Sequence, residues 1–127
     1  KRRHKTRNAQ KRCFACAALS YKIFGWGIFS DEVFEREIAY YKKVMHPYGL
    51  PLDNRSDYTK SDWLLWVACL TESKEDFTFF TKLMWNAYNT MSTRVPMTDW
   101  YFTDTAEMRG FIHRTVQGGL FIRLMME

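Results

Sequence analysis

The sequence predicts an all-α chain of three to five helices joined by two long polar loops. Three segments, residues 31–46, 62–71 and 74–91, are predicted helices with a strong apolar pattern, and a fourth apolar pattern runs from 111 to 124. Two polar stretches, 51–61 and 92–110, separate them, and the second is too long and too aromatic to be a mere connection. At 127 residues the chain provides at most one domain.

Residues 1–21 differ in composition from the rest. The first twelve residues hold seven of the 19 Lys and Arg and none of the 14 Asp and Glu, so the remainder carries a net charge of −2. This pattern predicts a solvated, disordered tail, and binding of nucleic acid or anionic lipid is the less favoured alternative. The apolar run after this tail is too short to be a secretion signal. The sequence contains no run of about 18 apolar residues, so no membrane-spanning helix is predicted.

The three cysteines do not form a disulfide framework. Cys13 and Cys16 have CxxC spacing, but no second pair accompanies them, so neither a metal site nor a cofactor is expected. Cys69 lies within an apolar run and is predicted to be a core residue.

Residues 24–49 are predicted to form a buried bend followed by a helix. Gly25 and Gly27 separate aromatic residues, which indicates a tight bend with buried side chains. Ser30 is a predicted N-cap for the helix over 31–46, whose acidic residues lie early and basic residues late, as the helix dipole favours. Pro47 ends this helix, and His46 is interpreted as a charge at its C-terminus rather than as a ligand.

The stretch 51–66 is a polar loop that runs directly into an apolar helix. Thr59 or Ser61 is predicted to cap that helix. The helix is apolar on every side over residues 63–70, so other parts of the protein must cover it all round. The start of such a helix offers free N–H groups and a partial positive charge. The sequence therefore places a candidate polar site at the mouth of the most buried element.

The second half is predicted to contain a capped helix, a polar loop and a final helix. Ser73 is a predicted N-cap for the helix over 74–91. Residues around the Thr103–Thr105 turn form two short extended pieces that can pair as a hairpin. Gly118 and Gly119 interrupt the final helical pattern, and close approach of another helix is the simplest explanation.

At the two polar loops the sequence resembles the C-terminal part of the glutaminase A family. The resemblance is carried by residues 49–55 (GLPLDNR), 58–63 (YTKSDW), 93–101 (TRVPMTDWY) and 114–119 (RTVQGG) and extends over about residues 22–125. It implies a portion of an all-helical (α/α) toroid, similar in architecture to the six-hairpin glycoside hydrolases. Many members are exported, which is the localisation that the resemblance implies; the chain alone does not indicate one.

The resemblance divides the chain into residues 1–21, which do not look like the family, and 22–127, a C-terminal portion of its helical domain. The family is far longer, so the expectation is a truncated member that is inactive by itself and whose natural partner is the missing N-terminal part of the same domain. A truncated gene or a late-joining reading frame is the favoured origin of residues 1–21, and nucleic-acid binding is not expected.

The resemblance implies hydrolysis of L-glutamine to L-glutamate and ammonia, and the site roles are hypotheses on the matching positions. Such a site needs a carboxylate clamp, an anion for the ammonium group and a proton donor. Asp62 and Asp99 are the candidate acid and base, with Lys60 tuning the pKa or stabilising negative charge. The predicted substrate-binding residues are Asp53, Arg55, Tyr58, Trp63, Arg94 and Trp100.

Structural alternatives remain open for these residues. Asp62 can be simply a first-turn acid, and Asp53 with Arg55 can simply tie down the loop. A glycoside hydrolase-like activity is the alternative enzyme class, because paired carboxylates such as Asp62 and Asp99 beside Trp rings also suit sugar cleavage. A purely structural fragment is the third alternative.

Overall fold

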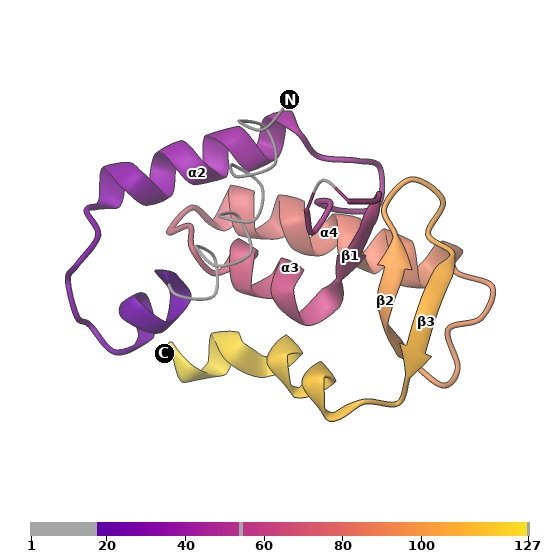
Figure 1. Ribbon diagram of the computed structural model, residues 1–127. Coiled ribbons are helices and arrows are strands. Elements are labelled where there is room, and N and C mark those ends of the chain that lie inside the picture. Colours follow the sequence, from indigo (N-terminus) through magenta and orange to yellow (C-terminus); the bar gives the residue numbers. More distant parts are fainter. Residues whose placement is uncertain (1–17, 54, 127) are drawn as a thin grey trace.

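The computed structural model describes residues 18–53 and 55–126, in which a small antiparallel sheet lies at one side of a group of helices (Figure 1). After a helical segment at 18–23, the elements are α2 (Asp31–Lys43), β1 (Tyr58–Lys60), α3 (Ser61–Ala68), α4 (Lys74–Thr90), β2 (Thr98–Phe102), β3 (Met108–Ile112) and the 3₁₀ helix η1 (Thr115–Met125). Within these residues the predicted three to five helices are confirmed, but the fold is mixed rather than purely all-α. The basic residues 1–12 and the CxxC motif lie outside the described residues.

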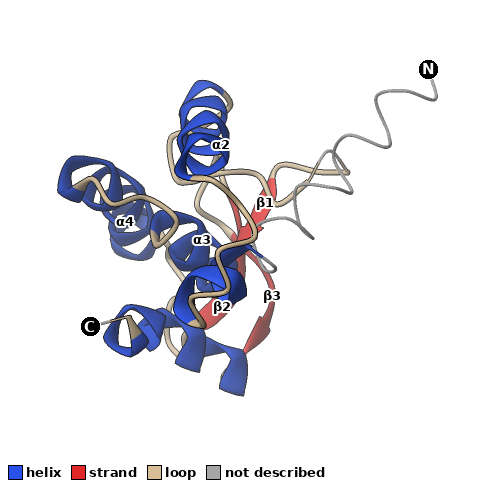
Figure 2. Cartoon of the chain, turned by 90° about the vertical axis from the view of Figure 1, so that its left-hand side faces the viewer, coloured by secondary structure: helices blue, strands red, loops and turns tan. Residues whose placement is uncertain are grey.

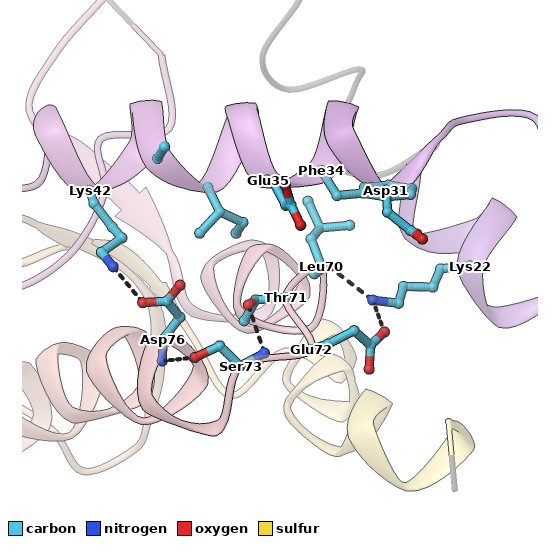
Figure 3. A pocket seen from close by; sticks show the side chains of 12 residues that line it. Lys22, Asp31, Phe34, Glu35, Lys42, Leu70, Thr71, Glu72, Ser73 and Asp76 are labelled. Atoms are coloured by element: carbon cyan, nitrogen blue, oxygen red, sulfur yellow. Dashed lines mark hydrogen bonds and ion pairs between the residues drawn. The ribbon is translucent and has the colours of Figure 1, made fainter.

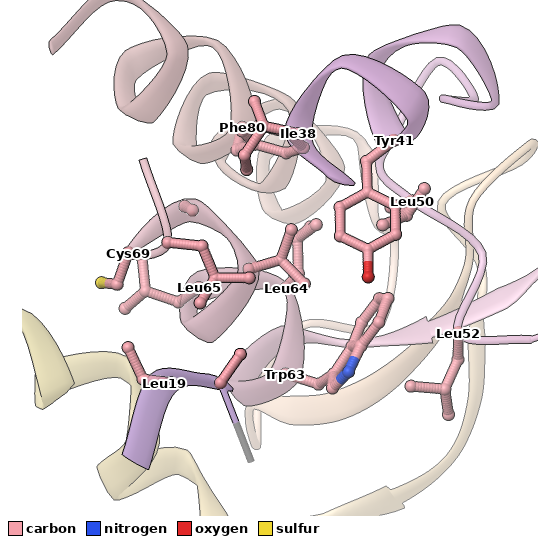
Figure 4. Packing of buried hydrophobic residues seen from close by; sticks show 14 residues of the cluster. Leu19, Ile38, Tyr41, Leu50, Leu52, Trp63, Leu64, Leu65, Cys69 and Phe80 are labelled. Atoms are coloured by element: carbon pink, nitrogen blue, oxygen red, sulfur yellow. The ribbon is translucent and has the colours of Figure 1, made fainter. Parts of the chain in front are cut away.

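Helix α3 lies at the centre of the molecule in both views (Figures 1 and 2). It packs against α4, η1 and the first two strands, as its apolar sequence on every side requires. Ile38 and Tyr41 of α2 and Phe80 of α4 belong to the core around it (Figure 4). Cys69, directly after α3, is fully buried, which confirms it as a core residue.

The sheet joins the two polar loops. β1 pairs antiparallel with β2, with Tyr58 opposite Phe102 and Lys60 opposite Trp100, and β2 pairs antiparallel with β3. The predicted hairpin around residues 103–105 is thus confirmed, and its first strand also binds the loop that precedes α3. Aromatic and β-branched residues dominate β1 and β2, and these residue types favour extended, half-buried strands.

The predicted cap of α3 is wrong. Thr59 lies in β1, where its backbone pairs with Tyr101, and the N-cap position belongs to Lys60, which makes no side-chain cap bond within the described chain. Pairing with β2 holds the backbone extended up to Lys60, so the helix begins directly at Ser61. This tight strand-to-helix junction places Lys60 and Asp62 two residues apart at the sheet edge.

The final helix also begins later than predicted. Phe111 and Ile112 belong to β3, and η1 begins only at Thr115. Phe111 and His113 have positive φ values of 53° and 56°, which turn the chain out of the strand. The predicted close approach of another helix is confirmed for Gly119, because a Cβ added there would lie 2.9 Å from Asp62 Cβ.

The bend at residues 24–29 is tight, as predicted, but it is not buried. Gly25 and Gly27 both have φ near +60°, a conformation that glycine adopts without strain. Phe24, Trp26 and Ile28 are nevertheless about 60% exposed. The bend therefore leaves these apolar side chains largely exposed.

Two serines that precede helices allow a test of capping. Ser73 Oγ accepts a hydrogen bond from Asp76 N at 3.2 Å, whereas Ser30 makes no such bond to the described part of α2. Replacing Ser73 by Ala is expected to lower the free energy of unfolding by about 1 kcal/mol, because an N–H of the first turn loses its acceptor. Ser30→Ala is the matched control and is expected to change it by less than about 0.5 kcal/mol. Urea denaturation of both variants checks this, and equal losses would contradict it.

Candidate functional site

The pairing of β1 with β2 brings Lys60 of the first polar loop to Asp99 of the second. Lys60 Nζ lies 2.9 Å from Asp99 Oδ2, across 39 residues of sequence. Asp62, in the first turn of α3, interacts electrostatically with both residues. The three predicted catalytic residues therefore form one cluster.

Asp99 is the fully buried anion of this cluster. Besides Lys60, Arg114 binds it with both arms of its guanidinium group: Nε donates to Oδ1 at 3.0 Å and Nη2 donates to Oδ2 at 2.5 Å. The side chain of Asp99 is 0% exposed. Burial alone would raise the pKa of Asp99, but the hydrogen bonds from Arg114 and Lys60 outweigh burial and hold it below its ordinary value.

Aromatic rings hold the two cations in place. Lys60 Nζ lies 4.8 Å from the centroid of the Trp100 ring and 4.7 Å from that of Phe111. The Arg114 guanidinium lies 4.2 Å from the Phe111 centroid, and the Trp100 and Phe111 rings stack at 4.9 Å. Cations over ring faces gain electrostatic attraction, so these rings position the Lys60 and Arg114 charges beside Asp99.

Asp62 has a different environment, although it lies beside Asp99. Its Oδ1 atom is buried and accepts no hydrogen bond from any described residue. Gly119 of η1 packs against its Cβ and against Trp66, so η1 covers this side of α3. Burial, and then the nearby charge of Asp99, raises the pKa of Asp62, while backbone N–H groups and Lys60 oppose that rise only in part.

Tyr88 brings α4 to the same cluster. Its hydroxyl donates to the backbone O of Thr98 at 2.6 Å, one residue before Asp99. Burial raises the pKa of Tyr88 to about 12, and the charges of Asp99 and Asp62 add to that rise. The phenol is therefore neutral at physiological pH and serves as a hydrogen-bond donor.

The structure places the other predicted substrate-binding residues at different distances from the cluster. Tyr58 lies next to the cluster, with its ring 5.3 Å from that of Trp100 in an edge-to-face contact. Asp53 and Arg55 bind each other through the backbone N and guanidinium of Arg55, as the loop-tying alternative describes. Trp63 is 5% exposed and packs in the core around α3. Their binding roles stay predictions.

Arg94 borders an apolar groove instead of the carboxylates. The groove has a volume of about 720 Å³ and runs along α4 past Trp85 and Tyr88 to Val95 and Met97. The Arg94 guanidinium reaches the backbone O of Tyr88 at 3.5 Å. Tyr88 thus connects the groove to the carboxylate cluster.

A second cleft, lined by both charged and apolar residues, lies away from the cluster, between α2 and the connection from α3 to α4 (Figure 3). It has a volume of about 340 Å³. The ion pairs Lys42–Asp76 and Lys22–Glu72 cross it. These contacts tie α2 to the core, and none of the predicted site residues lines this cleft.

Sequence reasoning missed two members of the cluster, Arg114 and Tyr88. Arg114 lies in a stretch that the sequence predicts as helix, whereas β3 carries it back beside β2, so its place depends on a strand pairing. One signal was available: an Asp flanked by Thr and Trp in a strand needs a cationic partner when it is buried. Over the described residues, no group of three or more His, Cys, Asp or Glu side chains is arranged to hold a metal, and no helix is long and apolar enough to cross a membrane.

Comparison with known proteins gives a consistent family assignment. A model of the glutaminase A six helical-hairpin domain matches residues 7–124, a range that begins before the predicted boundary at residue 22. Glutaminase A of Aspergillus oryzae is 34% identical over 106 residues, and a protein of Arthroderma benhamiae named "Probable glutaminase" is 36% identical over 107 residues. Each match covers 80% of this chain but only 15% and 12% of those relatives. No solved structure gives a significant match.

Proposed function

The chain belongs to the glutaminase A family, and from this premise we propose that its carboxylate cluster is part of a site that hydrolyses the side-chain amide of L-glutamine to L-glutamate and ammonia. The matched segment covers only a small portion of the relatives, so this activity is proposed for the assembled domain. Asp62, Asp99 and Lys60 are the residues that we assign to the chemistry.

The observation that carries the proposal is the pair of neighbouring carboxylates in opposite environments. Asp99 is held by two cations, while Asp62 has a buried oxygen without a hydrogen-bond partner in the described chain. Amide hydrolysis needs a group that can hold a proton near neutral pH and release it to the leaving nitrogen. Two titratable groups whose environments push their pKa values apart are typical of an acid–base site.

We further propose that the 127 residues do not turn over glutamine by themselves. The matched part of the chain covers only 15% and 12% of the length of the two relatives. Its described surface exposes large apolar side chains near both ends, including Phe24, Trp26, Phe121 and Leu124, each 58–67% exposed. Such exposure marks surfaces that another part of a protein covers, and the remaining helical hairpins of the same domain are the occupant that we propose.

A chimeric enzyme tests the activity. In it, residues 22–125 of this chain replace the matching segment of A. oryzae glutaminase A, so that Asp62 and Asp99 of this chain sit in a complete domain. Ammonia release from L-glutamine is expected for the chimera and for the parent, and none for the 127-residue chain.

Three results would count against parts of this proposal. Turnover of glutamine by the isolated chain would refute its inactivity. A folded chimera without ammonia release would refute the glutaminase assignment, and hydrolysis of aryl glycosides by that chimera would favour the glycoside hydrolase alternative. Circular dichroism and a cooperative melt establish that the chimera is folded.

A further inference from the structure

The two carboxylates of the cluster differ in how much of each is available for chemistry. Asp99 receives three hydrogen bonds from charged donors, which occupy both of its oxygens, and its side chain is 0% exposed. A substrate could reach it only by displacing Lys60 or Arg114. A buried anion with two cationic partners is stable as an anion and a poor proton carrier.

Asp62 has the opposite properties. Lys60 Nζ is bound to Asp99, and Asp62 Oδ1 is without a hydrogen-bond partner among residues 18–53 and 55–126. A desolvated carboxylate that lacks a cationic partner is unfavourable, and a proton removes that cost. The side chain is only partly buried, so it remains accessible from one side.

From this geometry we propose that Asp62 carries the proton that reaches the leaving nitrogen, and that Asp99 is a positioning residue which stays ionised and keeps the hydrogen bonds of Lys60 and Arg114 on itself rather than on Asp62. This inference rests on the proposed glutaminase function and divides the roles within that site. It also assigns to Arg114 a positioning role that keeps Asp99 ionised.

The proposed step balances in atoms and protons. The oxygen of a water molecule bonds to the amide carbon, and the C–N bond breaks with its electron pair remaining on nitrogen. The nitrogen takes the proton of the Asp62 carboxyl group and leaves as ammonia. The attacking water gives one proton back to Asp62, and its other proton stays on the new side-chain carboxyl group until it passes to ammonia on release. Glutamine and water thus become glutamate and ammonium with the enzyme unchanged.

Four charged or titratable groups act on Asp62 or lie beside it. Asp99 on β2 raises the pKa of Asp62, and Lys60 at the end of β1 lowers it. Tyr88 on α4 stays protonated, since its pKa is about 12. Arg114, directly before η1, is engaged by Asp99 through two hydrogen bonds. Both cations favour ionisation of Asp62, but their hydrogen bonds go to Asp99, so burial and the charge of Asp99 keep the pKa of Asp62 above its ordinary value.

The pH dependence of the chimera separates the two roles. Asp62→Asn is expected to reduce kcat/KM for glutamine by about 100-fold or more and to remove the limb on which activity falls as pH rises. Asp99→Asn removes a neighbouring negative charge and frees Lys60 to approach Asp62, so this limb is expected to remain and to move to lower pH. An Asp99 that served only stability would lower activity without moving the limb.

The outcomes distinguish the inference from the function on which it rests. An unmodified chimera that is folded and inactive removes the proposed function. An active chimera in which Asp62→Asn keeps full kcat/KM, or in which Asp99→Asn removes the limb instead, overturns only the division of roles. Arg114→Lys keeps the charge and is expected to retain more activity than Arg114→Ala.

A titration of the 127-residue chain tests the same assignment without activity. Carbon-detected NMR follows the side-chain carboxyl signals from pH 2 to pH 8, and the Asp62→Asn variant identifies the Asp62 signal by its loss. Asp62 is expected to titrate above, and Asp99 below, the ordinary aspartate pKa of about 3.9. The reverse order, or two ordinary values in a chain with dispersed spectra, would overturn the inference.

Discussion

Asp99→Asn is expected to lower the free energy of unfolding by about 3–5 kcal/mol at pH 7, because it leaves Lys60 and Arg114 partly buried without their counter-charge. The amide retains one oxygen acceptor, but its NH₂ group must then face one of the cationic donors. Removal of one partner from a buried ion pair costs far more than the pair contributes net. Urea denaturation followed by Trp fluorescence measures the loss.

Asp104→Asn is the matched control for this substitution. Asp104 lies in the exposed turn between β2 and β3 and takes part in no ion pair with a described residue. Its substitution is expected to change the free energy of unfolding by less than about 0.5 kcal/mol. A loss below about 1 kcal/mol for Asp99→Asn would show that Asp62 replaces Asp99 fully as the counter-charge of both cations, and it would contradict the account of Asp99 as their anchor.

The two carboxylates are expected to change the free energy of unfolding with pH in opposite directions. The folded-state pKa of Asp99 lies below its unfolded value, so its contribution is complete above about pH 3.9 and is lost as pH falls through the folded pKa. The folded-state pKa of Asp62 lies above its unfolded value. Ionisation of Asp62 therefore destabilises the fold as pH rises from the unfolded pKa through the folded pKa. A stabilising Asp62→Asn substitution at pH 7 would therefore be typical of a functional site.

Local signals were sufficient for most of the helices. The helix start after Ser73 follows from a capping serine and the acidic first turn, and α4 begins at Lys74 as predicted. The central position of α3 follows from apolar residues on every side of it. In each case the information lies within a few residues of the element that it determines.

The sheet and the cluster needed information that no local window contains. β1 is three residues long and pairs with a strand about 40 residues away, so its polar sequence resembles a loop until that partner is known. Arg114 reaches Asp99 only because β3 folds back along β2. Lys60, Asp62 and Asp99 were found through the family motifs, whereas the contact among them is a consequence of strand pairing.

The exposure of apolar residues that the sequence predicts to be buried has a different physical cause from the missed strand pairing. Phe24, Trp26 and Ile28 have the composition of a buried bend, and η1 contains no buried residue although most of its side chains are apolar. Apolar composition predicts burial, but it does not say whether the covering surface belongs to the same stretch of chain. For this chain the family assignment supplies the proposed cover, which is the rest of the helical domain.

Gly119→Ala is expected to lower the free energy of unfolding by about 1–3 kcal/mol, because the contact between η1 and α3 has no room for a methyl group. A Cβ at this position would lie 2.9 Å from Asp62 Cβ and 3.0 Å from Trp66 Nε1. Both neighbours belong to the central helix, whose other side chains are buried in the core, so η1 must move outward instead. Urea denaturation, with hydrogen exchange of the η1 amides, detects both the loss and the displacement.

Gly118→Ala is the matched control, because a Cβ there would meet no described atom within 4 Å. Alanine also restricts the unfolded chain more than glycine does, so this variant is expected to be more stable by about 0.4–1 kcal/mol. Opposite signs at adjacent positions would show that η1 packs on α3 through Gly119 in solution. Equal gains at both positions would mean that η1 does not rest on α3, and Asp62 would then lose the cover that raises its pKa. The Gly119→Ala variant therefore tests both the packing of the fold and the environment of the proposed proton donor.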